Sequence, residues 1–209
     1  MEGIKNILFD LGGVLVNLNR EACIEAYEKI GFKDIRSYLG DYGQKGPFKE
    51  LEEGNIGVTE FYEQIRPLTD NATDEQIADA FKAFLVDFPI DKLQLLRSLK
   101  EKGYRMLLLS NTNEILFPFV CETYFRQEGL SITDYFDQLF LSYEMRALKP
   151  DERAFLHVIE HGGIQPEETL FIDDSQENLD RAAYLGFETY LAPPYSDFSH
   201  IFKLDAVEI

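Results

Sequence analysis

The hydrophobic residues of the chain fall into two patterns, one typical of strands and one typical of helices. Short continuous apolar runs that end at a turn or a polar cluster are typical of strands buried on both faces of a parallel sheet. Such runs predict strands at residues 6–9, 104–109, 138–142 and 168–172, and residues 188–191 are predicted to form a fifth strand. Helical spacing between these runs predicts helices at residues 91–102, 115–126, 149–159 and 176–185. The alternation predicts an α/β fold, a doubly wound parallel sheet with helices on both faces.

The segment between the first two predicted strands has only the helical pattern. It predicts short helices that begin near residues 21, 48, 60 and 74. Thr59 is expected to cap the third helix, and the spacing of Thr73 and Gln76 is that of a capping box before the fourth. We therefore assign residues 17–89 to an inserted helical-bundle cap domain. Residues 1–16 and 90–209 are assigned to the core domain.

Polar side chains follow three of the predicted strands, at the point where each strand ends. Asp10 follows the first strand, Ser110 the second, and Asp173 and Asp174 the fourth. Taken singly, each is equally explained as a turn residue, a helix cap or a charge that favours a helix start. Because the carboxyl ends of parallel strands share one edge of the sheet, where such folds bind ligands, their convergence favours a functional site.

Composition and charge narrow the classes of partner. The 209 residues carry a net charge of −18, so nucleic acid and anionic membranes are not expected partners. The two cysteines, Cys23 and Cys121, are far apart and match no metal or redox spacing, which favours a reducing compartment. The chain has no long apolar run and starts with a strand rather than a signal peptide. We expect a cytoplasmic protein.

The residues at the predicted sheet edge suggest metal and phosphate chemistry. Several carboxylates close together stay ionised only when a cation joins them, and oxygen-only ligands favour Mg²⁺. Mg²⁺ held by few carboxylates usually also binds a phosphate. The Ser110 hydroxyl, the Asn111 backbone N–H and the Lys149 ammonium are suited to bind phosphate oxygens. Asp10 is then placed to attack phosphorus and form an aspartyl-phosphate intermediate.

Four segments of the chain, taken together and in order, resemble a known family. The run from Asp10 to Leu15, Ser110–Asn111, Lys149–Pro150, and Asp173–Asp174 with Asn178 resemble the four motifs of the haloacid dehalogenase-like hydrolase superfamily. The inserted helices resemble the small helical cap of its first subgroup. The resemblance covers essentially the whole chain. It implies a Rossmann-like core whose strands, numbered along the chain, lie in an order near 5-4-1-2-3.

The resemblance also implies a role for each matching residue. Asp10 would be the nucleophile, Ser110 would bind the transferred phosphoryl group, and Lys149 would stabilise both Asp10 and the phosphate. Asp10, Asp174 and the backbone carbonyl of Gly12 would bind Mg²⁺, and Asp173 would do so directly or through water. The implied function is hydrolysis of a small phosphorylated metabolite, such as a sugar phosphate, by a monomer or homodimer.

Gly12 departs from the usual pattern of the family's phosphatases. A second aspartate usually stands here as general acid and base, a role worth about 10²- to 10⁴-fold in rate. Similar members with glycine at this position are among the small sugar-phosphate phosphatases. We infer that the substrate has a good leaving group, such as an anomeric or acyl phosphate, which needs less protonation. Asn17 and Asn19 lie nearby, but an amide is no acid at neutral pH.

Other functions are weighed against this one. A haloacid dehalogenase also lacks the second aspartate, but it carries no paired acids like Asp173 and Asp174. A phosphonate hydrolase would need a cap lysine, for which Lys45 and Lys49 are the candidates. A catalytically weak or inactive phosphate-binding protein is the alternative from another class. Aromatic residues of the cap are candidates for a substrate cleft, namely Phe48, Phe61, Tyr62 and Phe84.

Overall fold

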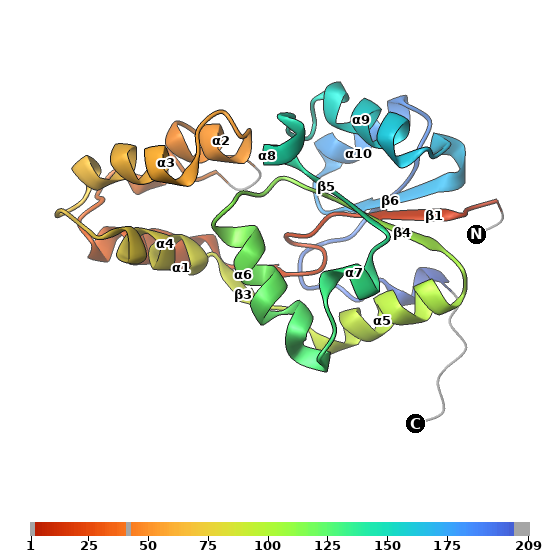
Figure 1. The fold of residues 1–209 in the computed structure, drawn as a ribbon. Coiled ribbons are helices and arrows are strands. Elements are labelled where there is room, and N and C mark those ends of the chain that lie inside the picture. The colour runs from red at the N-terminus through yellow and green to blue at the C-terminus, as the bar shows by residue number, and fades with distance from the viewer. Residues whose placement is uncertain (1–2, 41–42, 203–209) are drawn as a thin grey trace.

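Five parallel strands form the central sheet of the structure, a computed structural model that describes residues 3–40 and 43–202 (Figure 1). Their order is β5-β4-β1-β6-β7, which is the predicted order with the first strand in the middle. The strands are β1 (Asn6–Phe9), β4 (Arg105–Ser110), β5 (Gln138–Leu141), β6 (Thr169–Asp173) and β7 (Glu188–Leu191). The predicted doubly wound, Rossmann-like sheet is confirmed.

Alternate residues of the central strand pack against two different layers of helices. Ile7 and Phe9 of β1 belong to one apolar cluster, and Leu8 between them belongs to another. Helices α5 (Ile90–Glu101), α6 (Leu116–Thr123) and α7 (Ile132–Tyr135) lie on one side of the sheet. The other side carries α8 (Ser142–Met145), α9 (Glu152–Gly162) and α10 (Gln176–Tyr184) (Figure 1). Burial on both faces explains why β1 reads as a continuous apolar run.

Several helix ends differ from the predicted ones. The helix predicted at residues 115–126 ends at Thr123, and a 3₁₀ segment, Phe125–Glu128, follows. The helix predicted from Lys149 begins at Glu152, because the Asp151 carboxylate caps it by accepting a hydrogen bond from the Arg153 N–H. Further 3₁₀ segments are Ile35–Ser37, Arg66–Leu68, Pro166–Glu168 and Ser199–Phe202.

Four helices form a second unit beside the sheet, and they have an apolar core of their own. They are α1 (Arg20–Lys29), α2 (Pro47–Glu52), α3 (Val58–Ile65) and α4 (Asp74–Lys82). The rings of Tyr27, Phe48, Phe61 and Phe81 pack together, with centroid distances of 5.1–6.5 Å between neighbouring rings. The capping box of α4 at Thr73 is formed as predicted. The prediction for Thr59 is wrong, since α3 begins two residues earlier than predicted, at Val58, and Gly57 is its N-cap.

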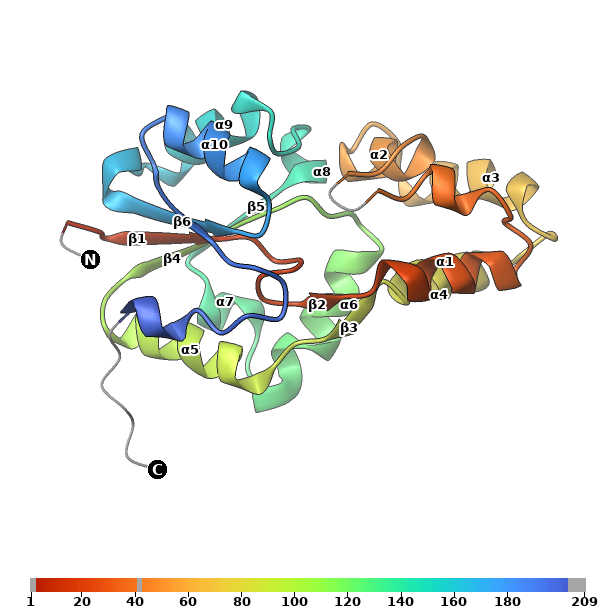
Figure 2. The same ribbon diagram turned by 180° about the vertical axis from the view of Figure 1, so that it is seen from behind.

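Two short strands connect this helical unit to the core, where the sequence pattern predicted only helices. β2 (Asn17–Leu18) pairs antiparallel with β3 (Leu85–Asp87), so the two connecting segments lie side by side (Figure 2). The Asn17 side chain donates a hydrogen bond to Asp87 across the pair, at 2.7 Å. Strands of two and three residues are too short to produce an alternating pattern. The division into residues 17–89 and the remainder stays a prediction.

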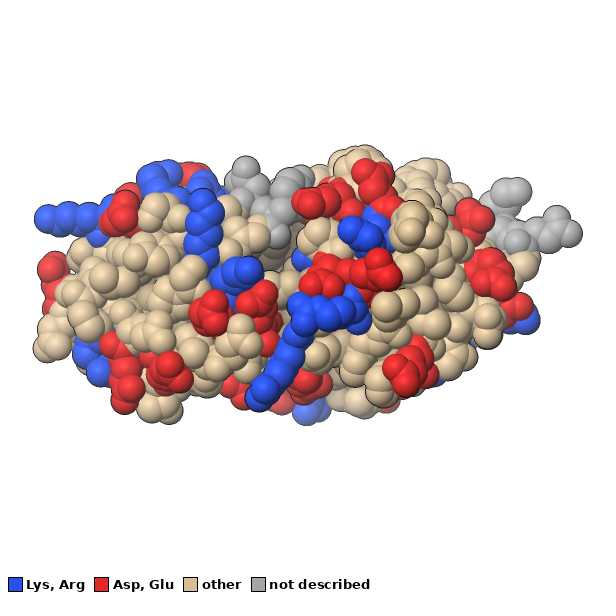
Figure 3. Space-filling view, turned by 90° about the horizontal axis from the view of Figure 1, so that it is seen from above, with Lys and Arg blue, Asp and Glu red and all other residues tan. Residues whose placement is uncertain are grey.

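The surface carries both signs of charge. Figure 3 shows acidic side chains over both the helical unit and the core, with basic side chains among them. Within the described residues, no helix is long and apolar enough to cross a membrane. Of the two cysteines, Cys23 is buried in the apolar core of the four-helix unit, and Cys121 is half-buried on α6.

Candidate active site

Three carboxylates from two strand ends meet at the edge of the sheet. Asp10 follows β1, Asp173 is the last residue of β6, and Asp174 comes next. One carboxylate oxygen from each lies within 4.8 Å of those of the other two. Asp173 is fully buried, and Asp10 is 8% exposed. The structure thus brings together the acidic residues that the motifs single out.

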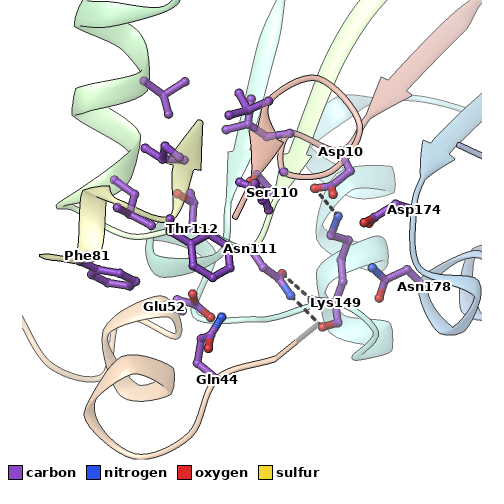
Figure 4. Close-up of a pocket in the computed structure, with 18 residues that line it drawn as sticks. Asp10, Gln44, Glu52, Phe81, Ser110, Asn111, Thr112, Lys149, Asp174 and Asn178 are labelled. Atoms are coloured by element: carbon purple, nitrogen blue, oxygen red, sulfur yellow. Dashed lines mark hydrogen bonds and ion pairs between the residues drawn. The ribbon is translucent and has the colours of Figure 1, made fainter. Parts of the chain in front are cut away.

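Lys149 lies among these carboxylates and is itself buried. Its Nζ is 2.7 Å from Oδ1 of Asp10 (Figure 4). The same Nζ is 2.7 Å from Oδ2 of Asp173. Asn111 holds the lysine in place through its side-chain amide. Its Oδ1 accepts from the Lys149 N–H and its Nδ2 donates to the Lys149 carbonyl, both at 2.9 Å. The prediction considered only the Asn111 backbone, so this use of the amide was missed.

The two neighbouring aspartates have different surroundings. The Asp173 carboxylate accepts hydrogen bonds from the Lys149 ammonium and the Ser175 N–H. The Asn178 Nδ2 donates to both of its oxygens, and all these distances are 2.7–3.1 Å. The Asp174 carboxylate instead lies against Gly13, where an added Cβ would be 2.2 Å from Oδ2. The lone pairs of Asp173 are therefore largely used by the protein, whereas Asp174 faces the cavity.

Burial dominates the electrostatics of the site. It raises the pKa of Asp10 to about 7, with Asp173 and Asp174 adding to the rise and Lys149 opposing it. Burial, followed by the Asp173 charge, raises the pKa of Asp174 to about 6. Burial disfavours the charge of Lys149, but the Asp10 and Asp173 carboxylates outweigh it, so its pKa is raised. Three carboxylates against one ammonium leave a site that attracts a further cation.

The donor set fits a hard divalent ion. The cluster offers oxygen atoms alone, and its ionised form is short of positive charge. Gly12 lines the same cavity and supplies only backbone groups to it. An added Cβ at Gly12 would lie 2.9 Å from Cδ1 of Leu18. The space that a side chain at position 12 would enter is therefore partly filled by Leu18 of the connecting strand.

Ser110 completes the polar end of the cavity from the neighbouring strand. It is the last residue of β4 and only 2% exposed, and Figure 4 shows it on the side of the cavity where Asp10 lies. The loop after it is held by Ser142, whose Oγ accepts from the Thr112 N–H and donates to the Thr112 carbonyl, both at 3.0 Å. This role of Ser142 was not predicted, since the residue was expected to end the strand at 138–142 and belongs to no motif.

The helical unit closes the opposite side of the cavity. Phe84 lines it as suggested, but Phe48 and Phe61 are fully buried in the apolar core of that unit, and Phe81 takes their place. Glu52 and Gln44 also line the cavity, and neither was predicted. The sequence did contain one indication that Glu52 is buried, because it lies one helical turn after the apolar Phe48, on the buried side of α2.

The lysines considered for imine chemistry lie elsewhere. Lys45 is exposed, and Lys49 is exposed with its Nζ 3.4 Å from Glu53. Neither lines the cavity that contains Asp10. The geometry therefore gives no support to the phosphonate hydrolase alternative.

The fold and the four motifs define a class of protein. The chain belongs to the haloacid dehalogenase-like hydrolase family, whose model matches residues 4–186. It is 38% identical over 188 residues to the D-ribitol-5-phosphate phosphatase of Bacteroides thetaiotaomicron, a match that covers 90% of this chain and 91% of that protein.

Solved structures agree with this assignment. A haloacid dehalogenase family enzyme from B. thetaiotaomicron, in complex with magnesium and inorganic phosphate, superposes with a TM-score of 0.90 at 45% identity and covers 96% of this chain and 100% of its own. A predicted hydrolase of the family from Porphyromonas gingivalis gives 0.88 at 36% identity, over 97% and 99%. An L-2-haloacid dehalogenase from Xanthobacter autotrophicus gives 0.62 at 21% identity, over 90% and 77%, and shares the fold.

Proposed function

We propose that the protein is a Mg²⁺-dependent phosphatase that hydrolyses a sugar phosphate or a related polyol phosphate. The observation that carries the proposal is the arrangement of the buried Asp10 and Lys149 and the partly buried Asp174 around one cavity. The similarity to D-ribitol-5-phosphate phosphatase and to an enzyme crystallised with magnesium and phosphate supports both the substrate class and the metal.

Asp10 is the proposed nucleophile. Its carboxylate attacks phosphorus, the alkoxide leaves, and water then hydrolyses the aspartyl phosphate so that phosphate is released and Asp10 is restored. Lys149, 2.7 Å from Asp10, favours the ionised form of Asp10 against the effect of burial and neutralises charge on the transferred group. Ser110 and the Asn111 N–H bind phosphoryl oxygens, and the Asn111 amide positions the lysine backbone.

Asp10, Asp174 and the Gly12 carbonyl are the proposed direct ligands of Mg²⁺. Asp173 acts through water, because its carboxylate is already engaged by Lys149, Asn178 and Ser175. When bound, the ion neutralises the carboxylates and the phosphate that they would otherwise repel.

The leaving group poses a separate question, because Gly12 has no side chain to protonate it. The relative's name specifies a phosphate on a primary alcohol, a poorer leaving group than the anomeric or acyl phosphates expected from the sequence. The preference of this chain for a good leaving group therefore stays a prediction. A monomer or homodimer, a cytoplasmic location and the absence of nucleic-acid partners also stay predictions.

Release of inorganic phosphate from a panel of sugar and polyol phosphates tests the proposal. We expect turnover with Mg²⁺, none with a chelator, and none from the Asp10→Asn variant, because the amide is no nucleophile. Lys45→Met, at an exposed cap lysine, is the control and should keep full activity. Absence of turnover across the panel, with Mg²⁺ still bound, would favour the phosphate-binding alternative.

A further inference from the structure

Two polar side chains from the four-helix unit point into the cavity opposite the catalytic residues. Glu52 ends α2, and Gln44 lies on the loop before it; Figure 4 shows both on the far side of the cavity from Asp10. Between the two ends the walls are apolar and include Phe81, Phe84 and Leu116. The cavity therefore has a phosphate end, an apolar middle and a second polar end.

The second polar end has no hydrogen-bond partner among the residues that the structure describes. Glu52 is only 8% exposed, and no residue in the ranges 3–40 and 43–202 makes a hydrogen bond or ion pair with its carboxyl group. Oε1 of Gln44 is buried and likewise without a partner among the described residues. Buried polar groups are costly to leave unpaired, so the buried Gln44 oxygen, in one cavity with the largely buried Glu52, indicates a ligand that pairs with both.

Charge restricts the chemistry of that ligand. Of the described residues that line the cavity, Lys149 is the one cation, and it is engaged by Asp10 and Asp173 at the phosphate end. No positive group among these lining residues stands near Glu52 to receive a second anion. Burial, with the neighbouring Glu53 charge adding to it, raises the pKa of Glu52 to about 8. Near neutral pH the carboxyl group is therefore mostly uncharged, and it both donates and accepts hydrogen bonds.

We propose that Glu52 and Gln44 bind the hydroxyl groups of the substrate, so that the site selects monophosphates whose remainder is uncharged and polyhydroxylated. A hydroxyl group pairs with an acceptor and a donor at once, which matches a carboxyl group beside an amide oxygen. The apolar walls contact the carbon chain. A carboxylate at the far end of the substrate would meet Glu52 without a counter-charge and would bind poorly. This inference rests on the proposed function for its phosphate end.

A matched set of four phosphates tests the inference by binding rather than by turnover. Calorimetry on the Asp10→Asn protein with Mg²⁺ compares ribitol 5-phosphate, pentyl phosphate, 5-phosphoribonate and 1-amino-1-deoxyribitol 5-phosphate. All share the phosphate end and the chain length. We expect ribitol 5-phosphate to bind at least about tenfold tighter than the other three, from two or more hydrogen bonds without an uncompensated charge. Equal affinity for ribitol and pentyl phosphates would overturn the inference, as would preference for the amine.

Substitutions assign the preference to the two residues. Glu52→Leu and, separately, Gln44→Leu should weaken ribitol 5-phosphate about tenfold while leaving pentyl phosphate unchanged or tighter. Glu52→Gln keeps an uncharged hydrogen-bonding group of the same size and should keep most of the preference. Glu60→Gln, on the exposed side of α3, is the control. Gln44 lies outside any helix, so its variant keeps the test informative if Glu52→Leu fails to fold. Equal loss for ribitol and pentyl phosphates would assign Glu52 and Gln44 a structural role.

The two proposals fail in different ways. Absence of phosphate release from the wild-type protein, with the binding preference intact, would reject the phosphatase and leave the hydroxyl-binding site standing. Release at equal rates from ribitol and pentyl phosphates would leave the phosphatase standing and reject the site.

Discussion

The Nζ atom of Lys149 lies 2.7 Å from Oδ1 of Asp10, in a contact that solvent hardly reaches. The Asn111 amide fixes the lysine backbone on one side, and Asp173 shares the same ammonium on the other. The nucleophile thus depends on a lysine that two other strand ends hold in place. Removing the charge of Lys149, Asp10 or Asp173 changes the charge balance of the whole cluster.

Replacing Lys149 by methionine tests that balance. The variant leaves Asp10 and Asp173 facing each other without the ammonium, and breaking such a buried pair typically costs about 3–5 kcal/mol. We expect a loss of this order in the free energy of unfolding in chelator at about pH 8, above the pKa of about 7 for Asp10. Turnover should fall by at least about 10³-fold. Denaturant unfolding and phosphate release measure the two effects.

The Lys45→Met variant is the matched control for this experiment, since it removes a lysine of the helical unit that is exposed. Its stability and turnover should stay near those of the wild type. Unchanged turnover in Lys149→Met would contradict the role assigned to the buried ammonium.

The stability of the metal-free protein should fall as the pH rises. The pKa of Asp10 is about 7 in the folded state against an ordinary value of 3.8, so folding favours its protonated form. The stabilisation from that proton is complete below the unfolded pKa and is lost as the pH rises through the folded pKa. The pKa of Asp174, raised to about 6, has an effect of the same sign.

Urea unfolding in chelator, from about pH 5 to about pH 8, measures this dependence. Other groups of the chain also titrate, so the decisive quantity is the difference between wild type and Asp10→Asn. We expect the variant to lose less stability over this range, and Mg²⁺ to stabilise the wild type more at the higher pH. Identical pH dependences for the two proteins would show that the Asp10 carboxyl is not perturbed.

Gly13 should be required for metal binding rather than for folding in general. Its φ is +78°, and an added Cβ would lie 2.2 Å from Oδ2 of Asp174. Gly13→Ala must therefore move Asp174, and we expect Mg²⁺ affinity to fall at least about tenfold, as for lost support of a metal ligand. Gly103→Ala is the control, because Gly103 has φ +88° and open space around it. Equal Mg²⁺ affinity in the two variants, measured by calorimetry, would contradict the placement of Asp174.

Because position 12 carries no general acid, we predict that the rate of cleavage depends steeply on the leaving group. We expect anomeric and acyl phosphates to be cleaved faster than alkyl phosphates, because their leaving groups need less protonation. The Cβ of Gly12→Asp would meet only the Leu18 side chain within 4 Å, and the new carboxyl group should raise the rate for alkyl phosphates by about 10²-fold or more, the usual worth of a general acid. Steady-state kinetics on both substrate classes measures this. Equal rates for the two classes in the wild type would refute the prediction.

The sheet was predictable because its signals are local. The three central strands β1, β4 and β6 contain continuous apolar runs, and the polar residues of the site stand where these runs end. The connecting pair, β2 and β3, was missed because strands of two and three residues produce no period. The N-cap of α3 was missed because a glycine, rather than the nearby Thr59, stands at the helix start.

The site was predictable on the core side and hidden on the other. Asp10, Ser110, Lys149 and the paired aspartates belong to ordered motifs at strand ends. Glu52 and Gln44 belong to no motif, and which side of a short helix or loop faces the cavity depends on how the helical unit packs. The position of Glu52, one helical turn after Phe48 on the buried face of α2, was the one feature that indicated its burial.

The central claim is that Asp10 carries the phosphoryl group during turnover. Rapid acid quenching of the wild-type protein with ribitol 5-phosphate and Mg²⁺, followed by mass spectrometry of the peptide that contains Asp10, tests it most directly. We predict a peptide heavier by one phosphoryl group, modified at Asp10 and absent in chelator and in Asp10→Asn. Turnover of the substrate without this adduct, or an Asp10→Asn protein that still turns over, would contradict the account.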